Sequence, residues 1–356
     1  MRRKLWLVMG VVALAALSVS CVSNASQDAL KPQGPYAQEI NNLFTSVFWI
    51  AAAIFFLVEG VLVLFVVKYR HRMGRTEIPP QIHGNTRLEI AWTILPALIL
   101  VGVAVPTVAT IWDLAGKPTG DVMHVTVIGH QFWWEYRYTD PDMKTASGNP
   151  ITTANVMVIP ENKTVYLSIE AEPKDIPVGE TVIHSFWIPE LAGTQDAVPG
   201  RTNHIYMQAD HPGTYWGQCK ELCGLSHANM RTKVVAETAT DFATWVAAQQ
   251  APAARSGDLL AQRGAEVFAG GQCILCHTID GLQTAAGNPV AGIGGPNLTH
   301  FASRDCFAGC TFRTNPDELR KWLADPPARK PGAAMPNYHL SEDQINALVA
   351  YLLSLN

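Results

Sequence analysis

Charged residues are scarce in this chain: Asp, Glu, Lys and Arg make up 16% of its 356 residues, against about 25% in an ordinary soluble protein. The net charge is −4, whereas nucleic-acid-binding proteins carry a surplus of basic residues, so this class is not favoured. Apolar residues reach only 48% and the mean hydropathy is +0.09, which is too little for a polytopic transporter. The 27 Gly and 23 Pro indicate a chain rich in loops, but its sequence is not of low complexity. Globular domains with a few membrane spans remain, and the length suggests two or three domains.

The charge that is present is unevenly distributed. Residues 1–112 carry nine Lys or Arg against five Asp or Glu, whereas residues 113–248 carry nine against sixteen. Residues 249–356 are nearly balanced, with eight against nine. A basic membrane end and an acidic middle fit a membrane-anchored protein whose outer part could meet a basic partner.

The N-terminus has the pattern of an export signal. Residues 2–4 are Arg-Arg-Lys, an apolar run from Leu5 to Val19 follows, and small residues come next. This predicts a secretory signal peptide over residues 1–20. Cys21 lies directly after it. Two interpretations stay open, a lipidation site like that of a bacterial lipoprotein and an incidental Cys after an ordinary signal peptide.

Two further apolar runs cover residues 43–67 and 90–112. Each can cross a hydrocarbon core of about 30 Å, which needs about 20 residues. The segment between them holds five Lys or Arg and two Glu, so the positive-inside rule places it in the cytoplasm. A transmembrane hairpin over residues 35–113 then leaves both ends of the mature chain on the outer face, as a signal peptide requires.

Two acidic residues belong to these spans. Glu59 lies mid-span, where an ionisable side chain is costly and often functional; we favour an orientation toward a partner subunit. Glu89 lies at the cytoplasmic mouth of the second span, where an acid costs little. From the residues alone it is a solvated boundary residue.

From residue 120 the pattern changes to short runs of β-forming residues. The clearest are 124–128, 132–138, 156–159 and 165–169, separated by turns rich in Gly, Pro, Asn and Asp. Short strands at regular spacing predict a sandwich or small barrel. We expect one β domain over residues 120–240.

This domain holds a soft set of metal ligands. His184 is followed 35 residues later by one loop with two thiols, an imidazole and a thioether: Cys219, Cys223, His227 and Met230. Sulfur with imidazole suits copper. A distant His with a Cys-His-Met loop is how cupredoxins build a copper site, and two Cys provide enough thiolate to bridge two coppers. Sharing one electron over two metals keeps the reorganisation energy low.

Two other interpretations of these residues were weighed. A disulfide between Cys219 and Cys223 is credible in an oxidising compartment, but it leaves His184, His227 and Met230 unexplained. A Cys2His2 zinc site has no use for Met230. We favour copper.

The C-terminal part has a different signature. Residues 247–256, mostly small and uncharged, predict a linker, and a helical pattern starts near Asp258 in a domain over residues 257–356. This leads into Cys273-Ile-Leu-Cys276-His277, the pattern of covalent haem c attachment with His277 as an axial ligand. Zinc and a redox dithiol are the false positives of so short a motif.

A second axial ligand is expected from a later loop. Met335 lies in a Gly- and Pro-rich segment and is the only Met after Met230, so it is the candidate thioether ligand, which raises the potential of a haem. Two Cys remain, Cys306 and Cys310. A local disulfide is the expectation for an exported domain, with free thiols or an adventitious metal as alternatives.

The motifs together carry a family resemblance. The block Cys219-x-Glu221-x-Cys223-x3-His227-x2-Met230, with His184-Ser-Phe-Trp upstream, resembles the dinuclear copper (CuA) motif of cytochrome c oxidase subunit II, and the likeness covers residues 35–240. The last hundred residues resemble a class I cytochrome c. A fusion of the two resembles the caa-type bacterial oxidases. The implied fold is multidomain: a two-helix transmembrane hairpin, a cupredoxin-like β-barrel and an all-α cytochrome c domain.

The resemblance also implies roles for single residues. The side chains of the copper-motif residues and the carbonyl of Glu221 would ligate copper, while the Glu221 carboxylate would bind magnesium at the subunit I interface. Asp196 and Arg201 match residues that face subunit I, and Glu89 matches the entrance of a proton pathway. Gly294-Gly-Pro296-Asn-Leu298 resembles the loop whose Pro carbonyl orients the axial His.

One departure from the family concerns the residue that accepts electrons from soluble cytochrome c, usually a Trp after Gly-His-Gln. Here Gly129-His130-Gln131 is followed by Phe132, so Trp133 or Trp134 is expected to take that role, with a purely structural role as the alternative. Residues 172–179 look like an insertion.

The resulting expectation is an electron-transfer subunit of a proton-translocating oxidase, not catalytic alone. Electrons would pass from an external cytochrome or other donor through haem c and CuA to haem a of subunit I, where O2 is reduced. The expected partners are subunit I, subunit III and membrane lipid, with no nucleic acid, and the expected location is the bacterial inner membrane with both redox domains on the periplasmic face. The alternative is a free-standing, membrane-tethered electron carrier.

Overall fold

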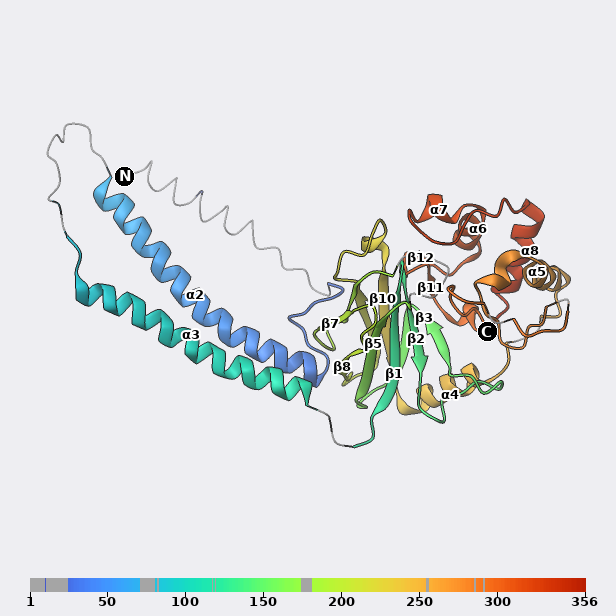
Figure 1. Ribbon diagram of the computed structural model, residues 1–356, viewed down its shortest axis with the longest axis horizontal. Helices are drawn as coiled ribbons and strands as arrows, with labels where there is room; N and C mark the ends of the chain where they lie inside the picture. The colour runs from blue at the N-terminus through green and yellow to red at the C-terminus, as the bar shows by residue number, and fades with distance from the viewer. Residues whose placement is uncertain are drawn as a thin grey trace.

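The computed structural model describes residue 10 and residues 25–356 apart from 71–80, 82, 117, 119, 174–180, 254–255, 285 and 291. Three features of the sequence lie outside the described residues: Cys21, most of the 172–179 segment and, except for residue 10, the predicted signal peptide. Along the described chain, a helical hairpin, a β domain and a helical C-terminal domain follow one another from one end of the molecule to the other, as Figure 1 shows. This is the multidomain fold that the sequence predicts.

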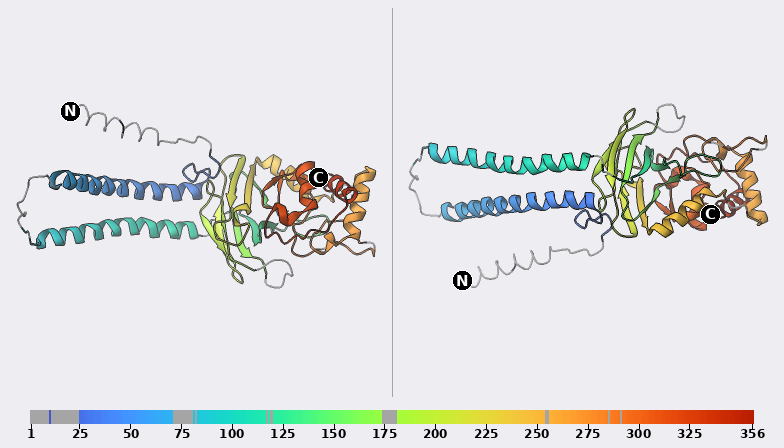
Figure 2. Two further views of the ribbon diagram at one scale, coloured as in Figure 1. Left: turned by 90° about the horizontal axis from the view of Figure 1, so that it is seen from above. Right: turned by 90° about the horizontal axis from the view of Figure 1, so that it is seen from below.

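Two long helices form the hairpin, α2 (Pro35–Tyr69) and α3 (Thr86–Ala115). Both are long and apolar enough to cross a membrane, and Figure 2 shows them side by side. Pro is tolerated at the start of α2, where its missing N–H costs nothing, and the Asn85 side chain caps α3 by accepting from the backbone N–H of Arg87 and Leu88. Both helices extend beyond the predicted spans 43–67 and 90–112.

The base of the hairpin is attached to the β domain. Gln33 donates its backbone N–H to Glu190 O (2.7 Å) and accepts from the Asp210 N–H (2.9 Å). A Cβ on Gly34 would lie 1.8 Å from Gln208 O, so only Gly permits this close approach. The contact fixes the β domain on the membrane end.

The β domain consists of two main sheets around one apolar core. A five-stranded sheet has the order β3-β2-β1-β5-β8, a three-stranded sheet has the order β4-β10-β9, and β6 and β7 form a small ribbon. The strands are β1 (Met123–His130), β2 (Trp133–Tyr138), β3 (Thr152–Ala154), β4 (Val156–Pro160), β5 (Val165–Ala171), β6 (His184–Trp187), β7 (Thr194–Ala197), β8 (Asn203–Met207), β9 (Gly213–Gln218) and β10 (Arg231–Glu237).

Side-chain alternation explains the core. Along β5 every second residue is buried, which is the period-2 pattern of a strand with one face inward. Trp134, Tyr136 and Leu167 are fully buried between the sheets, and each such side chain contributes about 1.5–3 kcal/mol of burial free energy. This is the cupredoxin-like arrangement expected from the sequence.

The segment after the β domain differs from the expectation. Helix α4 (Ala239–Gln250) begins at a Thr238 cap and packs on β4 and β10, so the first residues of the predicted 247–256 linker are helical. Gln250 also accepts from the Ala146 N–H and donates its side chain to Asp142 O. Small uncharged residues favour a linker, but Ala and Gln also form helices readily.

The C-terminal domain is held by a crossing of two helices. Helix α5 (Leu259–Gly270) begins at an Asp258 cap, close to the predicted start of the helical pattern, and packs on α8 (Glu342–Leu352). A Cβ on Gly264 would lie 2.1 Å from Ala347 O, so Gly sets the distance between the helices. The remaining elements are β11 (Cys306–Phe307), β12 (Phe312–Arg313), α6 (Pro316–Ala324) and α7 (Pro326–Arg329).

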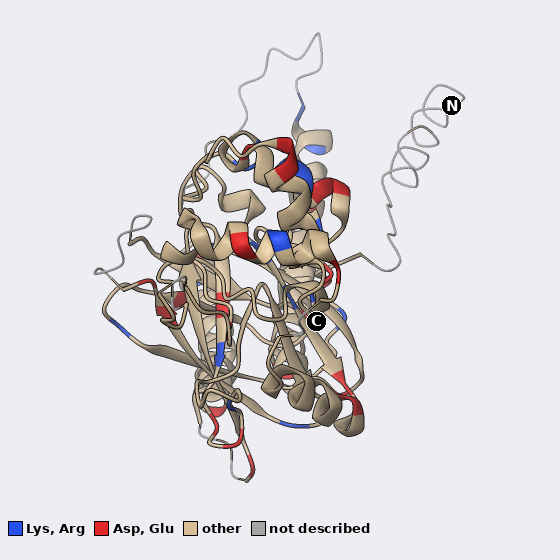
Figure 3. Ribbon diagram, turned by 90° about the vertical axis from the view of Figure 1, so that its right-hand side faces the viewer, with Lys and Arg blue, Asp and Glu red and all other residues tan. Residues whose placement is uncertain are grey.

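The outer end of the molecule has a mixed surface. Viewed from the side opposite the hairpin, Lys and Arg are interspersed with Asp and Glu, and α6 carries both signs (Figure 3). Its pairs Asp317–Arg320 and Glu318–Lys321 lie one turn apart.

Candidate copper and haem centres

One loop between paired strands carries most of the predicted copper ligands. Strands β9 and β10 are antiparallel, with Gln218 opposite Arg231, so residues 219–230 form a hairpin loop. The Cys219 N–H donates to Met230 O (3.0 Å) and closes the loop at its base. The Lys220 N–H donates to Ser185 O (3.0 Å), which brings the loop against β6 and its first residue, His184.

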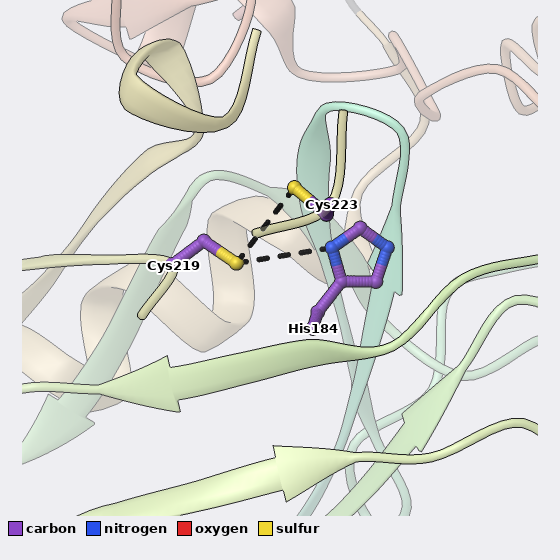
Figure 4. Close-up of side chains that lie close together, drawn as sticks. All are labelled: His184, Cys219 and Cys223. Atoms are coloured by element: carbon purple, nitrogen blue, oxygen red, sulfur yellow. Dashed lines mark hydrogen bonds between the residues drawn. The ribbon is translucent and has the colours of Figure 1, made fainter. Parts of the chain in front are cut away.

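The six predicted ligand groups come together in one cluster. The Cys219 Sγ lies 3.9 Å from the Cys223 Sγ and 3.9 Å from the His184 Nδ1 (Figure 4). The Cys223 Sγ lies 3.7 Å from the His227 Nδ1 and 3.8 Å from the Met230 Sδ, and the Glu221 carbonyl oxygen lies 3.2 Å from the Cys219 Sγ.

These distances fit ligands around metal. Two atoms each about 2.3 Å from one tetrahedral metal lie roughly 3.8 Å apart, whereas a disulfide brings two sulfurs to about 2.05 Å. Cys219 and Cys223 are free cysteines here, so the structure does not contain the disulfide weighed as an alternative. The donor set of thiolate, imidazole and thioether is soft, which is the chemistry that copper prefers.

The cluster is buried and one thiol is activated. His184, Cys219, Cys223 and Met230 are all buried. The hydrogen bond between Cys219 and Cys223, together with the contact with His184, lowers the pKa of Cys219. Thiolate is the form that ligates metals.

Residues from β1 and β2 pack behind the cluster. A Cβ on Gly129 would lie 2.8 Å from the His184 ring, so Gly leaves the space for the imidazole. Trp134 meets the same imidazole edge-on at 5.9 Å between ring centroids. The Gln131 side chain donates to Cys223 O (2.6 Å). These contacts orient the ligands from behind.

The residues predicted to face other subunits lie on the surface. The side chains of Glu221, Asp196 and Arg201 are exposed, and Glu89 is exposed in the first turn of α3. Glu59 is likewise exposed on α2. The magnesium and proton-pathway roles stay predictions.

The haem-attachment motif is shaped by a Gly-rich loop. The His277 Nδ1–H donates to Pro296 O (2.8 Å), as the resemblance implied. Burial lowers the pKa of His277, so the imidazole is neutral and its Nε2 lone pair is available to iron. Cβ atoms on Gly292 and Gly295 would come within 2.4 Å and 2.9 Å of the Cys276 backbone, so the loop can pack here only with Gly.

A single apolar cavity collects the predicted haem ligands. It is lined by Cys273, Cys276, His277 and Met335. The walls are apolar side chains from the surrounding helices and loops, including Phe268, Leu298, Phe301, Leu319, Leu323, Leu348 and Leu352. Two thiols, a neutral imidazole and a thioether around an apolar slot fit a covalently attached haem.

The cavity reaches the β domain. Phe132, Trp133 and His130 line its far side. Trp133 stacks flat on His130, with ring centroids 4.2 Å apart and an interplanar angle of 5°. Of the two candidate electron acceptors, Trp133 therefore lines the cavity of the haem-ligand candidates, and Trp134 packs in the core against the candidate copper ligand His184.

The imidazole on which Trp133 stacks belongs to a buried cluster of charged side chains. The His130 Nε2 lies 3.1 Å from the Glu135 carboxylate and its Nδ1 lies 3.0 Å from Glu172. Burial alone would lower the pKa of His130, but the contacts with Glu135 and Glu172 outweigh it and raise the pKa. No spacing rule connects His130 with Glu172 in the sequence, so the sequence does not indicate this cluster.

Cys306 and Cys310 form the expected local disulfide. Free thiols and a metal site at this pair are thereby excluded. Lys330 and Arg304, both buried and both lining the haem cavity, were not singled out by the sequence, since a lone basic residue in a loop is usually solvated.

The fold and these two sites define a class: a membrane-anchored protein that joins a cupredoxin-like domain to a cytochrome c domain. Three families match the chain in this order: "Cytochrome C oxidase subunit II, transmembrane domain" over residues 24–110, "Cytochrome C oxidase subunit II, periplasmic domain" over 123–238 and "Cytochrome c" over 261–356.

Named relatives agree with the family matches. Cytochrome c oxidase subunit 2 of Alkalihalophilus pseudofirmus is 37% identical over 349 residues, which is 96% of this chain and 94% of that protein. Its counterpart from Bacillus sp. (strain PS3) is 35% identical over 304 residues, 81% of this chain and 80% of that protein. The chain belongs to the cytochrome c oxidase subunit II family.

Among solved structures, the periplasmic domain of subunit II (CoxB) of Bradyrhizobium japonicum is similar at 29% identity. The superposition covers 36% of this chain and 94% of the CoxB chain, with a TM-score of 0.31.

Proposed function

We propose that this chain carries electrons from an external donor, through haem c bound at Cys273 and Cys276, to a dinuclear CuA centre, and on to haem a of subunit I. There, O2 would be reduced to water and protons pumped. The observation that carries the proposal is the single cavity lined on one side by the haem motif and on the other by Trp133. When bound, the haem and the two coppers supply the one-electron redox chemistry.

On the haem side, the residues would bind and orient the group. Cys273 and Cys276 provide the two thiols for thioether bonds, while His277 and Met335 would take the axial positions. The Pro296 carbonyl holds the His277 ring in the tautomer whose Nε2 faces the cavity. Apolar walls exclude water, which favours a high potential.

On the copper side, packing prepares the ligands before the metal arrives. His184, Cys219, Cys223, His227 and Met230 would bind by side chains and Glu221 by its carbonyl. These side chains pack against one another within the fold of the β domain. A rigid site suits fast electron transfer, because ligand positions change little between redox states.

The remaining roles concern partners. The Glu221 carboxylate would bind magnesium against subunit I, and Glu89 would lie at the entrance of a proton pathway. Trp133 is buried against the haem cavity, so an external donor reaches the C-terminal domain rather than this Trp. We place the hairpin in the bacterial inner membrane, in lipid and beside subunits I and III, with both redox domains on the periplasmic face.

The proposal is tested in the purified oxidase with the variant Cys223→Ser. We expect reduced haem c to accumulate and O2 uptake to stop, since the copper relay is broken while haem attachment is intact. Asp317→Asn, a change at an exposed residue of α6, is the matched control. O2 uptake that persists in a copper-free variant would contradict the proposed path. Isolation of the chain without a haem a subunit would instead favour the free-standing carrier.

A further inference from the structure

The disulfide hairpin around Cys306 and Cys310 has an unusual backbone. Ala308, Gly309 and Cys310 are three successive residues with positive φ, at 52°, 70° and 48°. Left-handed conformations cost free energy for residues with a Cβ and persist where surrounding contacts over-determine them. The disulfide closes this tight loop between β11 and β12, and the loop projects out of the C-terminal domain.

The hairpin tip lies against the copper-ligand loop. The Gly309 carbonyl accepts from the Arg231 N–H (3.0 Å), and the Thr311 hydroxyl donates to Asn229 O (3.0 Å). Arg231 and Asn229 are the two neighbours of the predicted copper ligand Met230. A Cβ on Gly309 would lie 2.5 Å from Asn229 O, so the tip reaches this position only with Gly.

The two cysteines are packed in the β domain's core rather than in their own. Cys306 and Cys310 are buried in the same apolar cluster as Phe132, Cys223 and Met230, whereas the intervening Phe307 belongs to the core of the C-terminal domain. At the base of the hairpin, the exposed carboxylate of Asp305 pairs with the buried Lys233 of β10. The hairpin therefore bridges both cores.

Lys330 locks the hairpin from the other side. Its side chain is 2% exposed, and its Nζ donates to Ala308 O and to Phe132 O, both at 2.7 Å. One acceptor belongs to the hairpin and the other to the β domain. Among the described contacts its partners are carbonyls, and burial lowers its pKa to about 7.

The next residues continue the connection on both sides. Pro331 O accepts from the Ser226 hydroxyl of the copper loop (2.6 Å). Gln131, next to Phe132, donates to Cys223 O (2.6 Å). The loop that leads to Met335 is thus attached through short polar contacts to the loop that carries the copper-ligand candidates.

We infer that the disulfide hairpin 305–313 is an intramolecular docking element, which holds the cytochrome domain in a fixed position on the copper-ligand loop, with Lys330 as its positioning residue. A flexible linker alone would give only a high effective concentration, about millimolar for a short one, with many relative orientations. The hairpin and Lys330 select one orientation. This inference concerns how the domains are joined and does not depend on the direction of electron flow.

The test is amide hydrogen exchange at Arg231 in the full chain, in detergent and with both domains loaded. Two variants break the docking element, Cys306→Ala with Cys310→Ala, and Lys330→Met. The control is Asp317→Asn on α6, an exposed carboxylate that pairs with Arg320 of its own helix. Copper and covalent haem content are measured in each chain to show that both domains are folded.

We expect exchange at Arg231 to accelerate roughly tenfold or more in both variants, since each loses hydrogen bonds or packing that hold the domains together, and to stay unchanged in the control. Unchanged exchange at Arg231 in either variant with copper and haem bound would overturn the inference. If the double Cys variant fails to hold haem, Lys330→Met decides alone. Because Lys330 also lines the haem cavity, a Lys330→Met chain that loses haem is replaced by Thr311→Val, which removes only the hydroxyl that donates to Asn229 O; exchange at Arg231 that stays unchanged in that variant overturns the inference.

Discussion

The copper and haem sites of this chain are built in opposite ways. The copper-ligand candidates extend from strand ends and one closed loop, and four of them are buried against each other. The haem-ligand candidates face an apolar cavity from different loops, with both thiols only half-buried. A small ion completes a site that packing has already formed, whereas a haem is itself a large part of its domain's core.

The largest expected effect follows from this difference. In the double variant Cys273→Ser and Cys276→Ser, we expect loss of covalent haem and loss of cooperative unfolding in the C-terminal domain, because its apolar cavity is left unfilled. A domain's stability is about 5–15 kcal/mol, which such a loss can exceed. Copper content should stay at its wild-type value. Calorimetry with metal and haem analysis checks both domains, and a C-terminal domain that keeps its unfolding transition would contradict the comparison.

The reciprocal change should be milder for the fold. Cys223→Ser removes a candidate copper ligand but leaves a side chain of similar shape, so we expect the mixed-valence copper signal to vanish while the β domain stays folded. Covalent haem should be retained in full. Electron paramagnetic resonance and circular dichroism are the measurements. Unfolding of the β domain in this variant would show that the copper site, like the haem site, depends on its metal for structure.

The helix crossing in the haem domain gives a sharper test of its packing. Gly264→Ala should destabilise the C-terminal domain by about 1–3 kcal/mol, because the new Cβ meets Ala347 O and a core accepts added volume poorly. Gly270→Ala in the same helix meets no atom within 4 Å, so it should be neutral or stabilise by up to about 1 kcal/mol. Thermal unfolding of the two variants is compared. Equal effects would mean that α5 and α8 do not cross as closely as described.

The smallest effect is a pH dependence in the β domain. The raised pKa of His130 contributes stability that is present below its ordinary value of 6.5 and is lost as the pH rises through the folded-state pKa. Burial opposes the charge of Glu135, but the hydrogen bond with His130 lowers its pKa, so its contribution is present above 4.5 and is lost as the pH falls. The free energy of unfolding of the wild-type chain should exceed that of His130→Gln by about 1 kcal/mol in mildly acidic buffer. This difference should shrink at alkaline pH.

The matched control for this effect is His124→Gln, on the same strand β1. His124 pairs with Asp140 at 2.9 Å, but its side chain is half exposed, and such surface pairs contribute about 0–1 kcal/mol. Thermal unfolding across the pH range is the measurement for both variants. A His130→Gln difference that does not change with pH would show that folding leaves the pKa of His130 unshifted, and one that grows as the pH rises would show that the fold holds His130 uncharged; either result contradicts the raised pKa.

Local spacing made much of this molecule predictable from sequence. The two membrane helices follow from long apolar runs, the Cys306–Cys310 disulfide from close spacing, and the placement of His277 beside Pro296 from a family loop. The copper-ligand candidates were also identified, because five of them lie in one loop of twelve residues. Each of these features depends on residues that are near one another in the chain or on a pattern with a fixed period.

The features that sequence did not reveal depend on contacts between distant segments. Lys330 is 198 residues from Phe132, and no pattern predicts that its amine is buried between two carbonyls. The start of the predicted linker became part of α4, because packing on β4 and β10 decided between two conformations that Ala and Gln both accept. The sequence offers Trp133 and Trp134 alike as electron acceptors, with a structural role as the alternative, and only the position of the C-terminal domain shows that Trp133 lines the apolar cavity.

The most direct test of the central claim is metal and haem analysis of the purified full chain, combined with optical and electron paramagnetic resonance spectra. The account predicts two coppers and one covalent haem per chain, with a mixed-valence copper signal. Haem without copper, with Cys219 and Cys223 joined in a disulfide even after reduction and copper loading, would contradict it and leave a membrane-tethered cytochrome.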